Sequence, residues 1–331
     1  MILLWGVPGD RPLEAVREAL QGLGSPFRLL DQRYASACEV TIDIRGSELR
    51  LELEQRNVAG ILDFSQVDAL YLRPIETTRA LPASLVDDPH AGQRAERVDR
   101  AIITWADLTD TLVINPPEAM APNNSKPYQL AQIAGYGFDV PATLVTTDAS
   151  AVRAFAARHG RVIYKSVSGV RSIVNVLGDA QLERLADVAN APTQFQEYVP
   201  GVDVRVHVVG AEVYATQVRS RAHDYRYASV EDGDVALSAI ELPAKIAQGC
   251  QTMATGMNLH VAGIDLRLTP AGRWVAFEVN PSPAFVYYEA ATGQPIANAI
   301  ARLLCSGGHE LPDKRRQRRV GVTTLPADSG H

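Results

Sequence analysis

Strict alternation of apolar and polar residues is clearest between residues 261 and 282. Two alternating segments, VAGIDLRL and RWVAFEVN, flank a turn-rich break at 269–272 and predict a β-hairpin. If the turn is centred on its Ala-Gly pair, Asp265 lies directly opposite Glu278, with Cβ atoms about 5 Å apart. Asn280 lies two residues further on and shares that face. The hairpin therefore presents two facing carboxylates and an amide on one side.

The other face of the predicted hairpin is apolar and is expected to face a core. Facing carboxylates repel unless a cation lies between them, and an all-oxygen donor set suits Mg²⁺. The alternative is a solvent-exposed hairpin whose polar face is merely acidic. The hairpin alone leaves both interpretations open. The apolar set comprises Ile264, Leu266, Leu268, Val275, Phe277 and Val279.

The first 115 residues show the pattern of a small α/β unit. A buried strand at 2–5 is followed by a helix that Asp10 can N-cap. No G-x-G-x-x-G fingerprint follows the first strand, so a dinucleotide site is not indicated. Further predicted elements are strands at 27–30, 69–72 and 111–114, a hairpin of 39–44 with 48–53, and a helix with the stripe Val98, Ile102, Trp105 and Leu108.

A second unit is predicted over 116–190. Its first helix contains Lys126, and a later strand ends at Lys165, just before a link of small residues that includes Ser168 and Gly169. A lysine beside exposed backbone N–H groups and hydroxyls suits phosphate. The alternative is a solvent-facing lysine before a hairpin, because the link does not match the G-x-x-x-x-G-K-[ST] pattern.

A third unit is predicted over 191–305. It begins with a strand at 193–199, and two further strands meet at Gly210. Asp203 and Arg205 share one face of the first of these, and Arg219 ends the second. Arginine forks match phosphate oxygens, although exposed arginine on an edge strand is the alternative.

Two further segments lack a clear apolar pattern. Residues 222–240 have weak periodicity and are expected to form a mobile loop, before a helix at 242–257. The tail 306–331 carries KRRQRR at 314–319 and is expected to be disordered. A nucleic-acid role for this basic run is the alternative to a solvated tail.

Composition narrows the function classes. Hydrophobic residues make up 46% and charged residues 21% of the 331 residues, which is typical of a globular protein. The net charge of −6 indicates no nucleic-acid partner. Three scattered cysteines form no zinc, redox or disulfide pattern, which fits a reducing cytoplasm. Neither a signal peptide, a membrane span nor a G-x-S-x-G elbow is indicated.

Taken together, these residues resemble the ATP-grasp ligases, and within them the RimK-like branch. The order and spacing of Lys126, Lys165, QEYV at 196–199, Asp203-x-Arg205 and the Asp265…Glu278-x-Asn280 set carry this resemblance. It is closer still to graspetide (microviridin-type) peptide ligases, through FRLLDQRY, YLRP at 71–74, HDYR at 223–226 and YYEAATGQPIANAI at 287–300. Tyr225, Phe285, Tyr287 and Tyr288 stand where that family often has Trp.

The resemblance implies an ATP-grasp fold of the α/β (α+β) class. A pre-ATP-grasp α/β domain at 1–115 would precede two α+β subdomains, 116–190 and 191–305, that sandwich ATP. The implied Mg²⁺ ligands are Asp265, Glu278 and Asn280, and Arg205 and Arg219 would neutralise the transferring phosphoryl group. Either 166–172 or 222–240 would be a lid. The implied ATP contacts are Lys126, Lys165, Ser168, Gly169, Gln196, Glu197, Tyr198, Val199 and Asp203.

The implied activity is that of an ADP-forming ligase that makes C–N or C–O bonds through an acyl phosphate. The expected substrate is a carboxylate on a peptide that becomes cross-linked by side-chain amides or esters. One alternative is a RimK-like ligase that joins a free amino acid to a peptide or small acid, and another is an ATP-binding protein without catalysis. We expect a cytoplasmic protein without membrane or nucleic-acid partners. A homodimer is left open.

Overall fold

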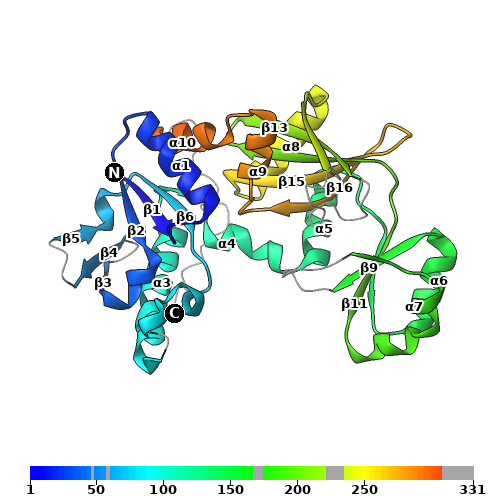
Figure 1. The fold of residues 1–331 in the computed structure, drawn as a ribbon, viewed down its shortest axis with the longest axis horizontal. Coiled ribbons are helices and arrows are strands. Elements are labelled where there is room, and N and C mark those ends of the chain that lie inside the picture. Colours follow the sequence, from blue (N-terminus) through cyan, green and yellow to red (C-terminus); the bar gives the residue numbers. More distant parts are fainter. Residues whose placement is uncertain (46–47, 57–59, 86, 167–173, 221–234, 308–331) are drawn as a thin grey trace, which may run out of the picture. The chain divides into compact units, whose positions relative to one another are not determined.

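The computed structural model describes residues 1–45, 48–56, 60–85, 87–166, 174–220 and 235–307 (Figure 1). These residues form two compact units. The first comprises Met1–Val7, Ser25–Val113 and the described residues from Arg302 on, and the second comprises Pro8–Gly24 and Ile114–Ala301. None of the helices in the described ranges combines the length and the apolar character that crossing a bilayer requires.

The first unit contains two sheets. One sheet has the order β2-β1-β6-β7, and β1 pairs in parallel with both of its neighbours. All five residues of β1 are buried, as expected for a central parallel strand covered on both faces. The second sheet is the antiparallel β3-β4-β5, which contains the predicted hairpin. The elements are β1 (Ile2–Gly6), β2 (Phe27–Asp31), β3 (Cys38–Arg45), β4 (Glu48–Gln55), β5 (Ile61–Asp63), β6 (Ala69–Arg73), α2 (Thr77–Ala80), α3 (Pro89–Leu108) and β7 (Leu112–Ile114).

The smaller sheet of the second unit has the order β10-β9-β11-β8 and is antiparallel. Its core face holds Val162 and Phe195, which pack with Val152 of a helix. The opposite face is the one that carries Lys165. The elements of this part are α4 (Pro117–Met120), α5 (Lys126–Gly135), β8 (Thr143–Thr146), α6 (Ala149–His159), β9 (Val162–Ser166), β10 (Asn175–Val176), α7 (Asp179–Glu183) and β11 (Thr193–Glu197).

The larger sheet of the second unit has the order β14-β13-β12-β15-β16. Helices α5 and α8 pack their apolar residues on one of its faces, around Val206, Ile264 and Met253. Burial raises the pKa of the Cys250 thiol on α8 to about 12, so this thiol behaves as an apolar core group. The remaining elements are α1 (Arg11–Gly22), β12 (Val202–Val209), β13 (Glu212–Ser220), β14 (Val235–Ile240), α8 (Ala244–Gly256), β15 (Val261–Leu268), β16 (Trp274–Asn280), α9 (Val286–Thr292) and α10 (Ile296–Cys305).

Two sequence predictions about single elements are wrong. Residues 235–240 of the expected loop form strand β14, because Val235 pairs beside β13 and packs with Val218 and Tyr288. Leu108 is 54% exposed although Trp105 and Ala106 in the same last turn are buried, because α3 ends at this residue.

Several other predictions fall outside the described residues. These are Ser168 and Gly169, the expected lid at 167–172, the first part of the expected loop at 222–234 with its HDYR sequence, and the tail from 308 with its basic run.

Candidate functional site

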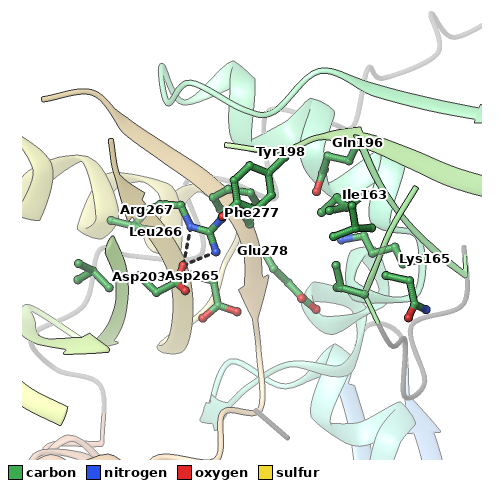
Figure 2. Close-up of a pocket in the computed structure, with 14 residues that line it drawn as sticks. Ile163, Lys165, Gln196, Tyr198, Asp203, Asp265, Leu266, Arg267, Phe277 and Glu278 are labelled. Carbon is green, nitrogen blue, oxygen red and sulfur yellow. Dashed lines mark hydrogen bonds and ion pairs between the residues drawn. The ribbon is translucent and has the colours of Figure 1, made fainter. Parts of the chain in front are cut away.

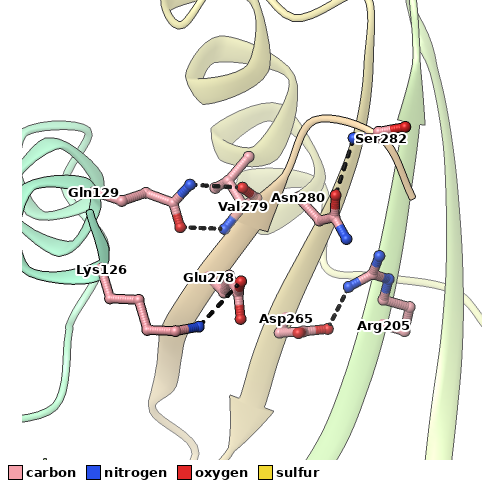
Figure 3. A network of polar contacts seen from close by, with 8 residues as sticks. All are labelled: Lys126, Gln129, Arg205, Asp265, Glu278, Val279, Asn280 and Ser282. Atoms are coloured by element: carbon pink, nitrogen blue, oxygen red, sulfur yellow. Dashed lines mark hydrogen bonds and ion pairs between the residues drawn. The ribbon is translucent and has the colours of Figure 1, made fainter. Parts of the chain in front are cut away.

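The β15–β16 hairpin has the register that the sequence predicted around its polar residues. Asp265 pairs with Glu278, and Asn280 pairs with Gly263. Gly272 adopts φ +78° in the connecting turn, a conformation that glycine tolerates best. The two carboxylates therefore lie side by side, as Figure 3 shows.

A β-bulge interrupts the hairpin between Asp265 and Leu266, which pairs with Ala276 rather than with Phe277. The extra residue shifts the alternation of β16, so Ala276 turns to the core. Phe277 instead lines a cavity beside Glu278. The prediction that Phe277 belongs to the core face is therefore wrong, because one inserted residue inverts every side chain beyond it.

Each of the paired carboxylates has its own basic partner. Arg205 Nη1 donates to Asp265 Oδ1 at 2.7 Å, and Lys126 Nζ lies 3.5 Å from Glu278 Oε1. Both basic side chains are more than nine-tenths buried. The repulsion expected between Asp265 and Glu278 is thus relieved by cations at the two flanks of the pair.

Arg205 occupies space that only a glycine leaves open. A Cβ atom on Gly263 would lie 2.0 Å from Arg205 Nη2 and 2.7 Å from the Cβ of Pro283. The guanidinium carbon also lies 5.9 Å from the centre of the Tyr288 ring. Gly263, directly across from Asn280, is therefore part of the site although it contributes no functional group.

His207 lies on the same face of β12 as Arg205 and is fully buried. Burial, with Arg205 close by, lowers the pKa of His207 well below its usual range. Its ring packs edge-on against Tyr288, with centroids 5.1 Å apart. The imidazole is therefore neutral near pH 7 and adds no charge that would compete with Arg205.

A cavity of about 380 Å³ lies between the smaller and the larger sheet of the second unit. Figure 2 shows Lys165 and Gln196 on one wall and Asp265 and Glu278 on the facing wall. Aliphatic and aromatic side chains, including Phe277, line the cavity walls between these polar groups. A flat apolar ring with a charged tail would match this distribution. Six residues of the predicted site line the cavity, namely Lys165, Gln196, Tyr198, Asp203, Asp265 and Glu278.

The implied ATP contacts at 196–199 include the end of β11 and the two residues that follow it, and their side chains take different directions. The Gln196 amide donates to Thr143 Oγ1 at 3.0 Å on the cavity wall. Glu197 turns away instead: Oε1 accepts from the Ala142 N–H at 3.0 Å. The Tyr198 ring stacks on the guanidinium of Arg161, whose central carbon lies 4.0 Å from the centroid of the ring.

Arg267 is a residue of this site that the sequence analysis missed. Its Nε donates to Asp203 Oδ1 at 2.7 Å, and its Nη1 donates to the Val199 carbonyl at 2.8 Å. It also lies 5.1 Å from the centre of the bulged Phe277 ring. One side chain thus joins Val199 to Asp203, two of the implied ATP contacts. The sequence signal that could have identified Arg267 is its position two residues after Asp265, which places both side chains on the same face of the strand.

Arg219 is not brought together with Arg205. Thr216 pairs with Arg205, and Arg219 lies three residues further along β13, so it projects to the opposite face of the sheet. It is exposed and does not line the cavity. A role for Arg219 in charge neutralisation stays a prediction that this geometry does not support.

The donors present fit Mg²⁺ in kind. Two carboxylates and one amide supply only oxygen, and the Asn280 amide oxygen, which accepts from the Ser282 N–H at 2.9 Å, has a second lone pair. Within the described ranges, no three His, Cys, Asp or Glu side chains cluster in a way that would hold a metal. The candidate Mg²⁺ site therefore depends on Asp265, Glu278 and Asn280 together.

Replacing Lys165 by Ala should weaken ATP binding roughly 10- to 100-fold in calorimetry. The change removes a charge-assisted contact worth about 1.5–3 kcal/mol. The lysine lies on the cavity wall, so this charge is partly shielded from water. Lys126→Ala should cause a milder loss, and Lys245→Ala, at an exposed position of α8, should cause none. Unchanged affinity in Lys165→Ala would mean that the lysine is only a surface residue.

Comparison with curated proteins gives relatives of moderate similarity. The chain is 26% identical over 227 residues to a probable alpha-L-glutamate ligase 1 of Pseudoalteromonas atlantica. The alignment covers 65% of this chain and 74% of that protein. It is 24% identical over 311 residues to human beta-citrylglutamate synthase B, which covers 88% of this chain and 75% of that protein.

Comparison with solved structures gives matches along most of the chain. The ATP-grasp ligase PsnB, in complex with a precursor variant, Mg and ADP, has a TM-score of 0.76 and 26% identity, covering 92% of this chain and 98% of PsnB. The macrocyclase MdnC of Microcystis aeruginosa, bound to precursor peptide MdnA, has a TM-score of 0.76, 21% identity and coverages of 92% and 100%. These likenesses agree with the predicted fold.

Residues 123–304 match the RimK-like ATP-grasp domain, and this segment contains both walls of the cavity and the hairpin. The predicted fold class and family are thereby confirmed. The chain belongs to the RimK-like ATP-grasp family of ADP-forming ligases.

Proposed function

We propose that this ligase modifies a peptide by joining its side chains through amide or ester bonds, in a graspetide-like pathway. The observation that carries the proposal is the cavity with Gln196 and Lys165 on one wall and the Asp265–Glu278 pair on the other. PsnB, which was solved with its precursor, Mg and ADP, matches this chain over 92% of its length, and this likeness supports a peptide substrate.

In this proposal the peptide carboxylate attacks the γ-phosphorus of ATP, which gives an acyl phosphate and ADP. An amine or hydroxyl then attacks the acyl carbon and expels phosphate. Little covalent chemistry falls to the protein, so positioning and electrostatics carry the rate. Arg205 would neutralise charge on the transferring group, since a guanidinium fork matches phosphoryl oxygens.

The nucleotide would lie in the cavity between the two sheets. Main-chain groups of 196–199 would bind the adenine edge, Asp203 the ribose hydroxyls, and Lys126 and Lys165 the phosphates. Asp265, Glu278 and Asn280 would hold Mg²⁺. The ion, when bound, would neutralise phosphate charge and orient the phosphate oxygens. The predicted contacts of Ser168 and Gly169 belong to the same proposal.

A RimK-like ligase that adds a free amino acid to a peptide or small acid is the second candidate. The 26% identity to a probable glutamate ligase favours it. The likeness of the fold to PsnB, with a TM-score of 0.76 and 26% identity over 92% of this chain, favours the peptide ligase. A non-catalytic nucleotide binder is disfavoured, because it has no use for Arg205 buried against Asp265. We further propose a cytoplasmic protein without nucleic-acid or membrane partners, and leave a homodimer open.

Turnover with γ-labelled ATP and an acidic candidate peptide should release ADP and labelled inorganic phosphate. Attack at the γ-phosphorus leaves the α–β linkage intact, which is why AMP should not form. The nucleotides are resolved by chromatography and the peptide is weighed by mass spectrometry. Loss of one water per bond would support cross-linking, and gain of an amino-acid residue would favour the second candidate. AMP with pyrophosphate would refute the phosphoryl-transfer mechanism.

A further inference from the structure

Strand β16 lies at the edge of the larger sheet and has a strand neighbour, β15, on one side only. The N–H and C=O groups on the other side of an edge strand need partners. At Val279 a side chain supplies both. The Gln129 amide donates to the Val279 carbonyl at 2.7 Å, and its oxygen accepts from the Val279 N–H at 3.0 Å. Gln129 thus replaces one residue of a missing strand, as Figure 3 shows.

The contact between Gln129 and β16 lies between two candidate metal ligands. Val279 lies between Glu278 and Asn280, two of the three candidate metal ligands, whose own ladder partners are on β15. The bulge at Phe277 precedes them immediately, and a bulge leaves the ladder locally disrupted. Strand β15 holds the backbone of this segment on one side, and Gln129 holds it at Val279 from the side that β15 cannot reach.

The same helix contacts the neighbouring residue of the strand. Gln129 lies three residues after Lys126, so both side chains leave the same face of α5. Lys126 lies 3.5 Å from Glu278 while Gln129 binds Val279. Helix α5 thus holds the Glu278 carboxylate through the charge of Lys126, and it holds the neighbouring Val279 backbone through the amide of Gln129.

We propose that Gln129 is a positioning residue that orients Glu278 and Asn280 for magnesium. The inference rests on the proposed function, because it assumes that these two residues bind the ion. Groups that orient metal ligands typically contribute 10- to 100-fold to metal affinity. The amide is 5% exposed, and its pairing uses both a donor and an acceptor, which an apolar side chain of equal volume lacks.

The test measures ADP binding by calorimetry at increasing magnesium concentrations. Gln129→Met should raise the magnesium concentration for half-maximal binding about 10- to 100-fold. ADP affinity in EDTA should stay unchanged, since the nucleotide cavity is untouched. Gln129→Glu, which keeps the acceptor for Val279 N–H, should fall between wild type and Gln129→Met. Gln132→Met is the matched control one turn along α5, where the amide donates to the Tyr128 hydroxyl, and it should behave as wild type.

A purely structural role would lower the melting temperature of Gln129→Met without moving the magnesium midpoint, and that result would overturn the inference. Glu278→Gln, run in the same titration, separates this failure from a wrong metal site. If Glu278→Gln shifts the midpoint and Gln129→Met does not, only the positioning role is rejected. If neither variant shifts it, the metal assignment in the proposed function is rejected as well.

Discussion

Glu278→Gln should lower turnover by more than about 100-fold while the protein stays folded. Losing a group that merely orients a metal ligand costs 10- to 100-fold, so losing a ligand charge should cost more. The side chain is only partly buried and Gln keeps its volume, so packing is preserved, although the buried Lys126 loses the charge of Glu278 at 3.5 Å. ADP release measures the activity, and thermal unfolding measures the fold.

Asp265→Asn should give a comparable loss of activity with a larger loss of stability. The neutral amide oxygen still accepts from Arg205, but the buried guanidinium then loses the negative charge of Asp265. Asp139→Asn is the control, because it weakens an exposed ion pair with Arg273 near the turn of the same hairpin. It should leave both readouts unchanged. Full activity of Glu278→Gln would contradict the assignment of the hairpin as the metal site.

Gly263→Ala should abolish ligation although it adds a single methyl group. That carbon would lie 2.0 Å from Arg205 Nη2, and the flexible end of the arginine is easier to move than the central strand β15. The guanidinium should therefore leave Asp265. We expect a loss of at least about 100-fold in kcat, in the range seen when a single transition-state donor is removed. ADP affinity in EDTA should be retained.

Overpacking also lowers stability, commonly by about 1–3 kcal/mol, so a matched control is needed. Gly256→Ala places its new carbon 2.5 Å from the Tyr136 ring, in α8 and away from Arg205. This variant should lose stability but keep turnover. If Gly263→Ala retains normal kcat, Arg205 is not required where the structure places it.

Local patterns were enough to predict most elements and the side-by-side placement of Asp265 and Glu278 in the candidate site. Alternation with a period of two gave the β15–β16 hairpin. The predicted pairing of Asp265 with Glu278 is present, but the bulge sets it together with the turn. Apolar stripes with helical spacing gave α1 and α5. These features depend on neighbours in sequence, so they survive without knowledge of the tertiary structure.

The bulge at Phe277 and strand β14 were not predicted, because both depend on partners that are distant in the chain. A bulge changes which side chains face the core without leaving a mark in the alternation itself. Strand β14, with the sequence VALSAI, follows a segment of weak periodicity, and it forms by pairing with β13. The opposite faces of Arg205 and Arg219 likewise follow from the pairing register of β12 and β13.

What the sequence alone determined was the type of chemistry. It supplied oxygen donors on one strand face, basic side chains at strand ends and in a helix, and a turn that joins the two strands of the hairpin. Only the tertiary structure decided which basic group meets which acid. Arg205 and Lys126 reach Asp265 and Glu278 from separations of 60 and 152 residues, and Gln129 reaches Val279 from 150. Such contacts follow from how whole elements pack, because periodicity places a side chain on a face and leaves its neighbour across the core undetermined.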